Sequence, residues 1–186
     1  MNFGAIKKND IANGKGVRVS LFVSGCRHRC YNCFNKETWD FNYGNKYNEN
    51  TKEEILSACD YSHIAGLSLL GGEPFEPENQ EELINLTKAF KERFLNKDIW
   101  CYTGFLFEDI LAGKAGDAKT ALKLLENIDV LVDGKFIEKL KNPALLFRGS
   151  SNQRIIDVKS SLITKKAELL PGKWTRAVGS LDIKEN

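Results

Sequence analysis

The sequence predicts an α/β fold with a mostly parallel sheet. The alternation of two kinds of segment and the overall composition support that class. Short β-branched and apolar runs alternate along the chain with segments whose apolar residues recur at helical intervals. This β-α-β-α order is typical of parallel sheets with helical crossovers. The length of 186 residues and the 42% hydrophobic content are ordinary for one globular domain with a substantial core.

Five short apolar runs are expected to form the strands of this sheet. The first is VRVSLFV, whose β-branched residues favour extended structure. In chain order the expected strands are residues 17–23, 66–70, 99–102, 130–132 and 145–147.

Helices are expected between these strands. Residues 51–54 (TKEE) have the spacing of a capping box, and Ile55, Leu56 and Cys59 follow at helical intervals. Further helices are expected at 81–94, 119–127 and 136–141. The pattern fades near Lys159, which predicts one domain over residues 1–158 and a C-terminal extension of unknown role over 159–186.

Polar or glycine-rich segments follow each expected strand. They are residues 26–33, 71–74, 102–104, 133–135 and 148–152. Because the carboxyl ends of parallel strands share one edge, where ligands bind, these segments are expected to converge on one site. The alternative is that they are ordinary βα loops, which are commonly polar and rich in glycine.

Charge and hydropathy indicate which partners to expect. The net charge is +2, so no nucleic acid or anionic membrane surface is expected as a partner. No apolar run approaches the roughly 20 residues of a membrane span. The N-terminal residues are polar and do not resemble a signal peptide, so a cytoplasmic location is expected.

Three of the five cysteines lie in one short segment. Cys26, Cys30 and Cys33 have the spacing C-x3-C-x2-C, which lets one loop wrap one metal centre. In a reducing compartment, clustered cysteines more often bind metal than form disulfides. A 4Fe–4S cluster has four irons, and this loop supplies three thiolates. The spacing therefore predicts a cluster with one open iron, able to chelate a substrate and pass it an electron.

Other arrangements of these residues stay open. The three cysteines could hold structural zinc with His28, or Cys30 and Cys33 could form a redox pair. A conventional four-cysteine cluster could recruit Cys59 or Cys101, although both lie in apolar periodic segments and are expected in the core. The charged or polar residues between the first two cysteines are expected to face solvent. They are Arg27, His28 and Arg29.

Seven stretches together resemble a known family. They are NGKGVR at 13–18, LFVSGC at 21–26, CYNCFN at 30–35, LLGGEP at 69–74, IWCYTG at 99–104, DVLVDGKF at 129–136 and FRGSSNQ at 147–153. The cysteine motif resembles that of the radical S-adenosylmethionine superfamily. DVLVDGKF and RGSSNQ resemble, more narrowly, the activating proteins of anaerobic (class III) ribonucleotide reductases. The chain departs from the family pattern at Asn32, where many members carry an aromatic residue or glycine.

The resemblance implies a fold and a set of site residues. The fold is a partial (β/α) barrel of the radical S-adenosylmethionine type, open on one side. Cys26, Cys30 and Cys33 would ligate three irons of a 4Fe–4S cluster, and the methionyl group of S-adenosylmethionine would chelate the fourth. The residues that would bind that ligand are Asn32, whose backbone would lie near the adenine, with Cys33 and Phe34 beside it, Gly71, Gly72 and Glu73 at the amino group, and Thr103, Asp133 and Lys135 at the ribose or carboxylate. Residues 148–152 would complete the pocket without an assigned role.

The resemblance also implies the reaction and the partners. The protein would be an oxidoreductase that cleaves S-adenosylmethionine reductively and places a glycyl radical on the large subunit of an anaerobic ribonucleotide reductase. It would need no catalytic side chain beyond the cluster ligands, and it would take its electron from an external donor such as flavodoxin. The alternatives are another small radical enzyme, either a different glycyl-radical activase or a deazapurine-modifying enzyme, and a non-catalytic metal-binding module.

Overall fold

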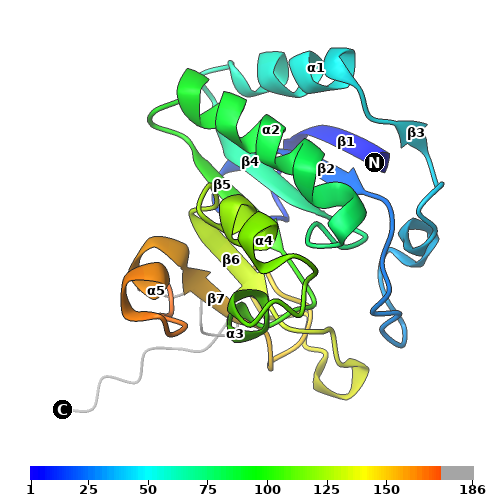
Figure 1. Ribbon diagram of the computed structural model, residues 1–186, viewed down its shortest axis with the longest axis vertical. Coiled ribbons are helices and arrows are strands. Elements are labelled where there is room, and N and C mark those ends of the chain that lie inside the picture. The colour runs from blue at the N-terminus through cyan, green and yellow to red at the C-terminus, as the bar shows by residue number, and fades with distance from the viewer. Residues whose placement is uncertain (173–186) are drawn as a thin grey trace.

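Seven strands form one open sheet in the computed structural model, which describes residues 1–172 (Figure 1). In chain order they are β1 (Asn2–Asp10), β2 (Val17–Val23), β3 (Asn45–Lys46), β4 (Ile64–Gly71), β5 (Asp98–Tyr102), β6 (Val130–Asp133) and β7 (Arg154–Asp157). Their order across the sheet is β3-β1-β2-β4-β5-β6-β7. β2, β4, β5 and β6 are parallel, whereas β1, β3 and β7 add antiparallel pairs at the two edges. The expected α/β class is therefore confirmed, and the sheet is not closed.

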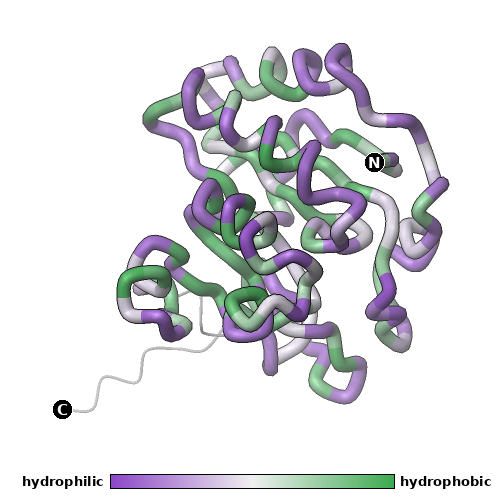
Figure 2. The backbone as a smooth tube through the Cα atoms, in the orientation of Figure 1, coloured by the Kyte–Doolittle hydropathy of each residue, from purple (hydrophilic) through white to green (hydrophobic). Residues whose placement is uncertain are grey.

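Helices cover one face of this sheet. They are α1 (Glu49–Cys59), α2 (Pro77–Arg93), α3 (Phe107–Leu111), α4 (Ala118–Leu125) and α5 (Val158–Thr164), with 3-10 turns η1 (Lys36–Trp39) and η2 (Glu138–Leu140). In Figure 1, α1, α2 and α4 lie on the same side of the strands. The main core fills the space between them, with Leu21 and Leu69 from the sheet packed among Leu83 and Leu124 from the helices. Figure 2 shows this pattern as hydrophobic strands beneath helices with hydrophilic outer turns.

The opposite face of the sheet is only partly covered. A small cluster of Trp100, Val130, Val132 and Ile155 is buried there. Side chains alternate between the two faces of a strand, so Cys101 joins the main core while Tyr102 points to the uncovered side. This side of the sheet is left available for a site.

Four of the five expected strands are confirmed, and the fifth is wrong. Residues 145–147 do not form a strand: residues 146–147 are in a turn, where Phe147 adopts a left-handed φ of +56° and its ring packs edge-on against Trp100. The strand next to β6 is instead β7, which runs antiparallel to it. The expected helix at 136–141 is reduced to the 3-10 turn η2.

Several elements were not expected: β1, β3 and α3, besides β7 and α5. β1 forms a hairpin with β2, but much of the strand faces solvent and reads as a polar segment. α3 is only five residues long, too short for a periodic pattern to reveal it.

The first helix begins earlier than its capping box suggests. Asn48 is its N-cap, and the Asn48 side chain accepts a 3.0 Å hydrogen bond from the backbone N–H of Thr51. The expected cap at Thr51 is therefore wrong, although Ile55, Leu56 and Cys59 are buried as predicted.

Periodic structure continues beyond Lys159. Asp157 caps α5 by accepting a 2.8 Å hydrogen bond from the Ser160 N–H, and Val158 is buried. The expectation that regular secondary structure ends near Lys159 is thus wrong, because α5 continues to Thr164. The division into a domain of residues 1–158 and an extension stays a prediction, and residues 173–186 of that extension lie outside the described residues.

None of the helices in residues 1–172 is both long and apolar enough to cross a membrane.

A buried arginine joins three strands near the end of the sheet where β2 begins. The Arg18 side chain is fully buried, and its Nε and Nη2 atoms donate to the Ser68 hydroxyl (2.7 Å) and the Leu67 carbonyl (2.8 Å). Its Nη1 pairs with Asp98 Oδ1 at 2.6 Å. These contacts tie β2 to β4 and β5.

We expect Arg18→Met to lower the free energy of unfolding by about 2–4 kcal/mol, because buried acceptors on β4 lose a charged donor. Lys8→Met is the control: its 2.9 Å pair with Glu54 is about half exposed on both sides and should cost less than about 1 kcal/mol. Urea titration measures both. Equal costs for the two variants would contradict a structural role for Arg18.

Candidate active site

A cavity of about 590 Å³ opens beside the carboxyl ends of the parallel strands and extends over the uncovered face of the sheet. The loops after β2, β4, β5 and β6 all contribute to its lining, so the expected convergence is confirmed. Residues 148–149 line it as well, although they precede a strand instead of following one. Because β7 is antiparallel to β6, the start of β7 lies at the edge where β6 ends.

The three clustered cysteines all line this cavity and form no disulfide. Their loop leaves β2 and is fixed by backbone hydrogen bonds to η1, from Gly25 N–H to Thr38 O (2.8 Å) and from Cys26 N–H to Trp39 O (3.1 Å). Arg29 and Asn32 adopt left-handed φ values of +47° and +54°, which turn the chain back between the cysteines. The loop thus directs three thiols at one space.

The arrangement of the thiols fits a cluster better than one ion. Within residues 1–172, no three His, Cys, Asp or Glu side chains come close enough to share a single metal ion. The thiols instead surround a common space, as ligands on separate irons must. The backbone N–H of Asn35 lies 3.4 Å from Cys33 Sγ, and N–H···S contacts of this kind are one of the features that set cluster potentials.

Burial holds two of these thiols in the protonated form. Burial, assisted by the nearby charge of Glu73, raises the pKa of Cys26 to about 12. Burial also raises the pKa of Cys30, and a hydrogen bond from the Phe136 N–H opposes the shift. Because iron binds the thiolate, occupation of this site must release protons.

The remaining two cysteines lie away from the cavity. Cys59 and Cys101 are fully buried in the main core on the helical side of the sheet. Their expected core location is confirmed, and this location gives no support to a four-cysteine cluster.

The carboxylate of Glu73 joins the loop after β4 to the loop after β5. It is buried, and its Oε1 accepts hydrogen bonds from the Phe75 N–H and the Thr103 hydroxyl, both at 2.8 Å. Its Oε2 accepts a 2.7 Å hydrogen bond from the Gly104 N–H. Glu73 and Thr103 therefore line the cavity while their polar atoms already bind each other.

His28 lies between the first two cysteines and is not directed to solvent, so that expectation is wrong. Its side chain is 9% exposed and packs edge-on against Phe105, with ring centroids 4.5 Å apart. His28 Nε2 lies 3.0 Å from Glu73 Oε2, although the angle is not that of a hydrogen bond. Arg27 and Arg29 are exposed as expected, and Arg27 pairs with Glu76 and Glu78.

The two glycines before Glu73 are required by contacts within the protein. Gly71 has a left-handed φ of +106°. A Cβ on Gly72 would lie 2.5 Å from the Gly25 carbonyl oxygen and 2.9 Å from that of Thr38. Gly72 N–H also donates to Val23 O at 2.7 Å, so this loop packs directly on the cysteine loop.

Some expected ligand-binding residues do not line the cavity. Asp133 is buried, but its carboxylate accepts from the Phe107 N–H (2.8 Å) and pairs with Arg154. Asn32 is exposed, and Lys135 lines a separate cavity of about 450 Å³. Phe34 does line the main cavity, where its ring contacts Phe136.

The RGSSNQ segment is held in place by its last residue. Gln153 Oε1 accepts from the N–H groups of Gly149 (2.9 Å) and Ser150 (3.1 Å), while Gln153 Nε2 donates to Gly134 O (3.0 Å). Arg148 and Gly149 reach the cavity, whereas residues 150–152 do not.

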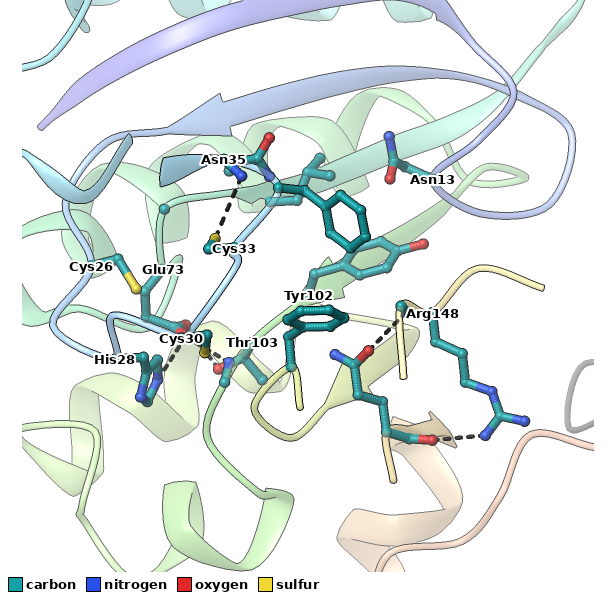
Figure 3. A pocket seen from close by; sticks show the side chains of 18 of the residues that line it. Asn13, Cys26, His28, Cys30, Cys33, Asn35, Glu73, Tyr102, Thr103 and Arg148 are labelled. Carbon is teal, nitrogen blue, oxygen red and sulfur yellow. Dashed lines mark hydrogen bonds and ion pairs between the residues drawn. The ribbon is translucent and has the colours of Figure 1, made fainter. Parts of the chain in front are cut away.

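Sequence reasoning did not predict several side chains that line the cavity. They are Asn13, Asn35, Trp39, Phe136 and Gln153 (Figure 3 labels Asn13 and Asn35), whereas Tyr102 lines the cavity as the expected convergence of residues 102–104 implied. All but Trp39 lie within or at the ends of the recognised stretches, which could have drawn attention to them, but their direction depends on strand register and loop conformation.

Comparison with known proteins decides the family. Residues 12–156 match a family model described as a 4Fe-4S single cluster domain. The chain is 43% identical over 155 residues to the anaerobic ribonucleoside-triphosphate reductase-activating protein of Enterobacteria phage T4, covering 83% of this chain and 93% of that protein. The chain belongs to the family of anaerobic ribonucleoside-triphosphate reductase-activating proteins. The Escherichia coli K12 member is 38% identical (82% of this chain, 96% of that protein), and the Vibrio cholerae member 40% (83% and 97%).

Membership in this activating-protein family supports the iron–sulfur interpretation of the cysteine loop. The matched domain runs from the β1–β2 hairpin through β7 and so includes every loop that lines the cavity.

We expect Gly72→Val to lose iron as well as activity, because the new side chain would displace the backbone beside Cys26. Gly113→Ala is the control for a disturbed backbone away from the site, since Gly113 has a left-handed φ (+76°) that a side chain would strain, its nearest Cβ contact is 3.3 Å and it does not line the cavity. Iron content per folded protein after anaerobic reconstitution measures the effect. Full iron content in Gly72→Val would show that the loop contact is dispensable.

Proposed function

We propose that this protein activates an anaerobic ribonucleotide reductase by generating its glycyl radical, through reductive cleavage of S-adenosylmethionine at a 4Fe–4S cluster. The observation that carries the proposal is the joint position of Cys26, Cys30 and Cys33 on one cavity, in a chain of the activating-protein family. In this proposal the three thiolates hold three irons, and the residues of the loop after β4 lie beside S-adenosylmethionine.

The cluster, when bound, supplies the electron that splits S-adenosylmethionine into methionine and a 5′-deoxyadenosyl radical, which takes a hydrogen atom from glycine. The residues of this chain bind and orient the reactants. Glu73 fixes the loops after β4 and β5 relative to each other, so that Gly71 and Thr103 keep one position beside the thiols. The apolar side chains of Phe22, Leu70 and Phe136 along the cavity exclude water from a reactive intermediate.

Four further features belong to this proposal. The partner is the large subunit of the reductase, and the electron comes from an external donor such as flavodoxin. The partial (β/α) barrel of the radical S-adenosylmethionine type is supported by the open sheet with one uncovered face. A cytoplasmic location would suit thiols that must remain reduced. Asn32, Phe34 and Asp133 stay predictions as ligand contacts.

The direct test combines reduced protein, S-adenosylmethionine and the reductase large subunit without oxygen. A glycyl-radical EPR doublet should appear on the reductase, and 5′-deoxyadenosine should form with it. Formation of 5′-deoxyadenosine without that doublet would remove the reductase as partner. Consumption of a deazapurine precursor instead would support the rival enzyme class.

Replacing Cys26, Cys30 or Cys33 by Ala should remove the visible iron–sulfur absorption and abolish 5′-deoxyadenosine formation, because each thiolate holds a separate iron. The Cys59→Ala protein is the matched control, since that thiol lies in the core away from the cavity. Iron analysis and circular dichroism separate cluster loss from unfolding. A full cluster in any of the three loop variants would reject the assigned ligand set.

A further inference from the structure

A group of exposed apolar side chains lies beside the cysteine end of the cavity. We call this group the apolar rim, and its members are Tyr31 (77% exposed), Phe34 (64%), Ile137 (41%) and Leu140 (41%). Single exposed apolar residues are ordinary on protein surfaces, whereas a contiguous group of them marks a binding surface. The rim is therefore informative if its members lie together.

Two segments bring the rim together, the cysteine loop and the turn η2 with its N-cap residue. The Phe34 and Phe136 rings lie 5.1 Å apart, and Lys141 Nζ lies 5.2 Å from the centre of the Phe34 ring. Phe136 and Lys141 flank η2, so this turn lies beside Phe34. Tyr31 follows Cys30, whose thiol accepts a hydrogen bond from the Phe136 N–H. The four apolar side chains thus belong to one surface.

The rim is continuous with the cavity. Phe34 belongs to the rim and also lines the cavity, and so does the adjoining Lys141. In Figure 1 the cysteine loop and the segment after β6 both project at the lower right of the view, away from α1 and α5. A molecule that enters the cavity from this side lies against the rim.

Cations surround the rim. Within its two segments the only carboxylate is that of Glu138, which pairs with Lys141 at 3.8 Å. Arg29, Lys135 and Lys139 form no ion pair within residues 1–172. The segments therefore carry an excess of positive charge around an apolar centre. A protein surface with an apolar centre and carboxylates at its border would complement both properties.

We propose that the apolar rim is the docking surface for the large subunit of the reductase, which meets it with an apolar patch bordered by carboxylates. This inference rests on the proposed function. A radical formed in the cavity can take a hydrogen atom only from a glycine that enters the cavity. The protein that carries this glycine must then cover the mouth, and the rim is the apolar surface continuous with that mouth.

Two other occupants fit the rim less well. A second copy of this chain on the rim would close the mouth against a polypeptide of the reductase. An electron donor does not have to enter the cavity, because an electron can pass through protein. A donor therefore has no need of a surface that is continuous with the mouth.

The test places a carboxylate in the rim of the holoprotein. Leu140→Asp and Ile137→Asp are compared with Leu95→Asp, whose side chain is 88% exposed in the turn before β5, at the opposite edge of the sheet. Dithionite supplies the electron, so no protein donor is required. Glycyl-radical formation at varied concentrations of the large subunit gives the KM for that subunit. Iron content and circular dichroism show that each variant is folded and loaded.

We expect Leu140→Asp and Ile137→Asp each to raise the KM for the large subunit by about tenfold or more, because a buried carboxylate would face an apolar patch of the partner. The Kd for S-adenosylmethionine, measured from the EPR signal of the reduced cluster, should stay unchanged, since neither residue lines the cavity. Leu95→Asp should change neither quantity.

Lys139→Glu tests the charged border of the rim. We expect it to raise the KM for the large subunit by about three- to tenfold at low salt and to reduce the dependence of that KM on salt. Lys88→Glu is the matched control, because Lys88 is an exposed cation of α2 on the helical side of the sheet.

Equal KM values for the rim variants and Leu95→Asp would overturn the inference. So would a dimer of the unaltered protein that Leu140→Asp separates at an unchanged KM, which would assign the rim to a second copy. A rim variant that loses activity with flavodoxin but keeps its KM with dithionite would assign the rim to the donor and would also overturn it. If the unaltered protein forms 5′-deoxyadenosine but no glycyl radical on the subunit, the proposed function fails first and this inference fails with it.

Discussion

The carboxylate of Glu73 accepts hydrogen bonds from Phe75, Thr103 and Gly104 in the protein interior. A buried carboxylate is stable only where donors of this kind surround it, so the loops after β4 and β5 must close on it as the chain folds. The Glu73 N–H in turn donates to Gly25 O at 2.9 Å, which fixes the cysteine loop to the same point. The positions of all three loops therefore depend on Glu73, through its side chain for the loops after β4 and β5 and through its backbone N–H for the cysteine loop.

The two faces of the sheet have different roles: one packs into the main core and the other lines the cavity. On one face the helices cover an apolar core that includes Cys59 and Cys101, and this core is far larger than the cluster around Trp100 on the other face. The carboxyl ends of parallel strands lie at one edge of a sheet. The parallel pairing of β2, β4, β5 and β6 therefore brings the loops that follow these four strands together, beside the face that the helices leave uncovered. Ordinary crossover topology is enough to assemble the site.

Local sequence signals predicted four strands and the cysteine loop, because buried strands are short apolar runs and ligand spacing is a local property. They could not place Asp133, whose partner Arg154 lies 21 residues further along the chain. The sequence signals placed Arg148 at the site correctly but for the wrong reason. Arg148 was expected after a parallel strand, whereas it precedes β7, which is antiparallel to β6. The orientation of His28 depends on its contact with Phe105, which only the assembled loops provide.

The contacts between the cysteine loop and its neighbours run largely through backbone atoms, as in the bonds from Gly72 to Val23 and from Gly25 to Thr38. Mutations of cavity side chains leave such bonds in place. Side chains that line the cavity can therefore change while the backbone framework around the three cysteines is kept. In evolutionary terms, the loop framework and the side chains around it can diverge at different rates.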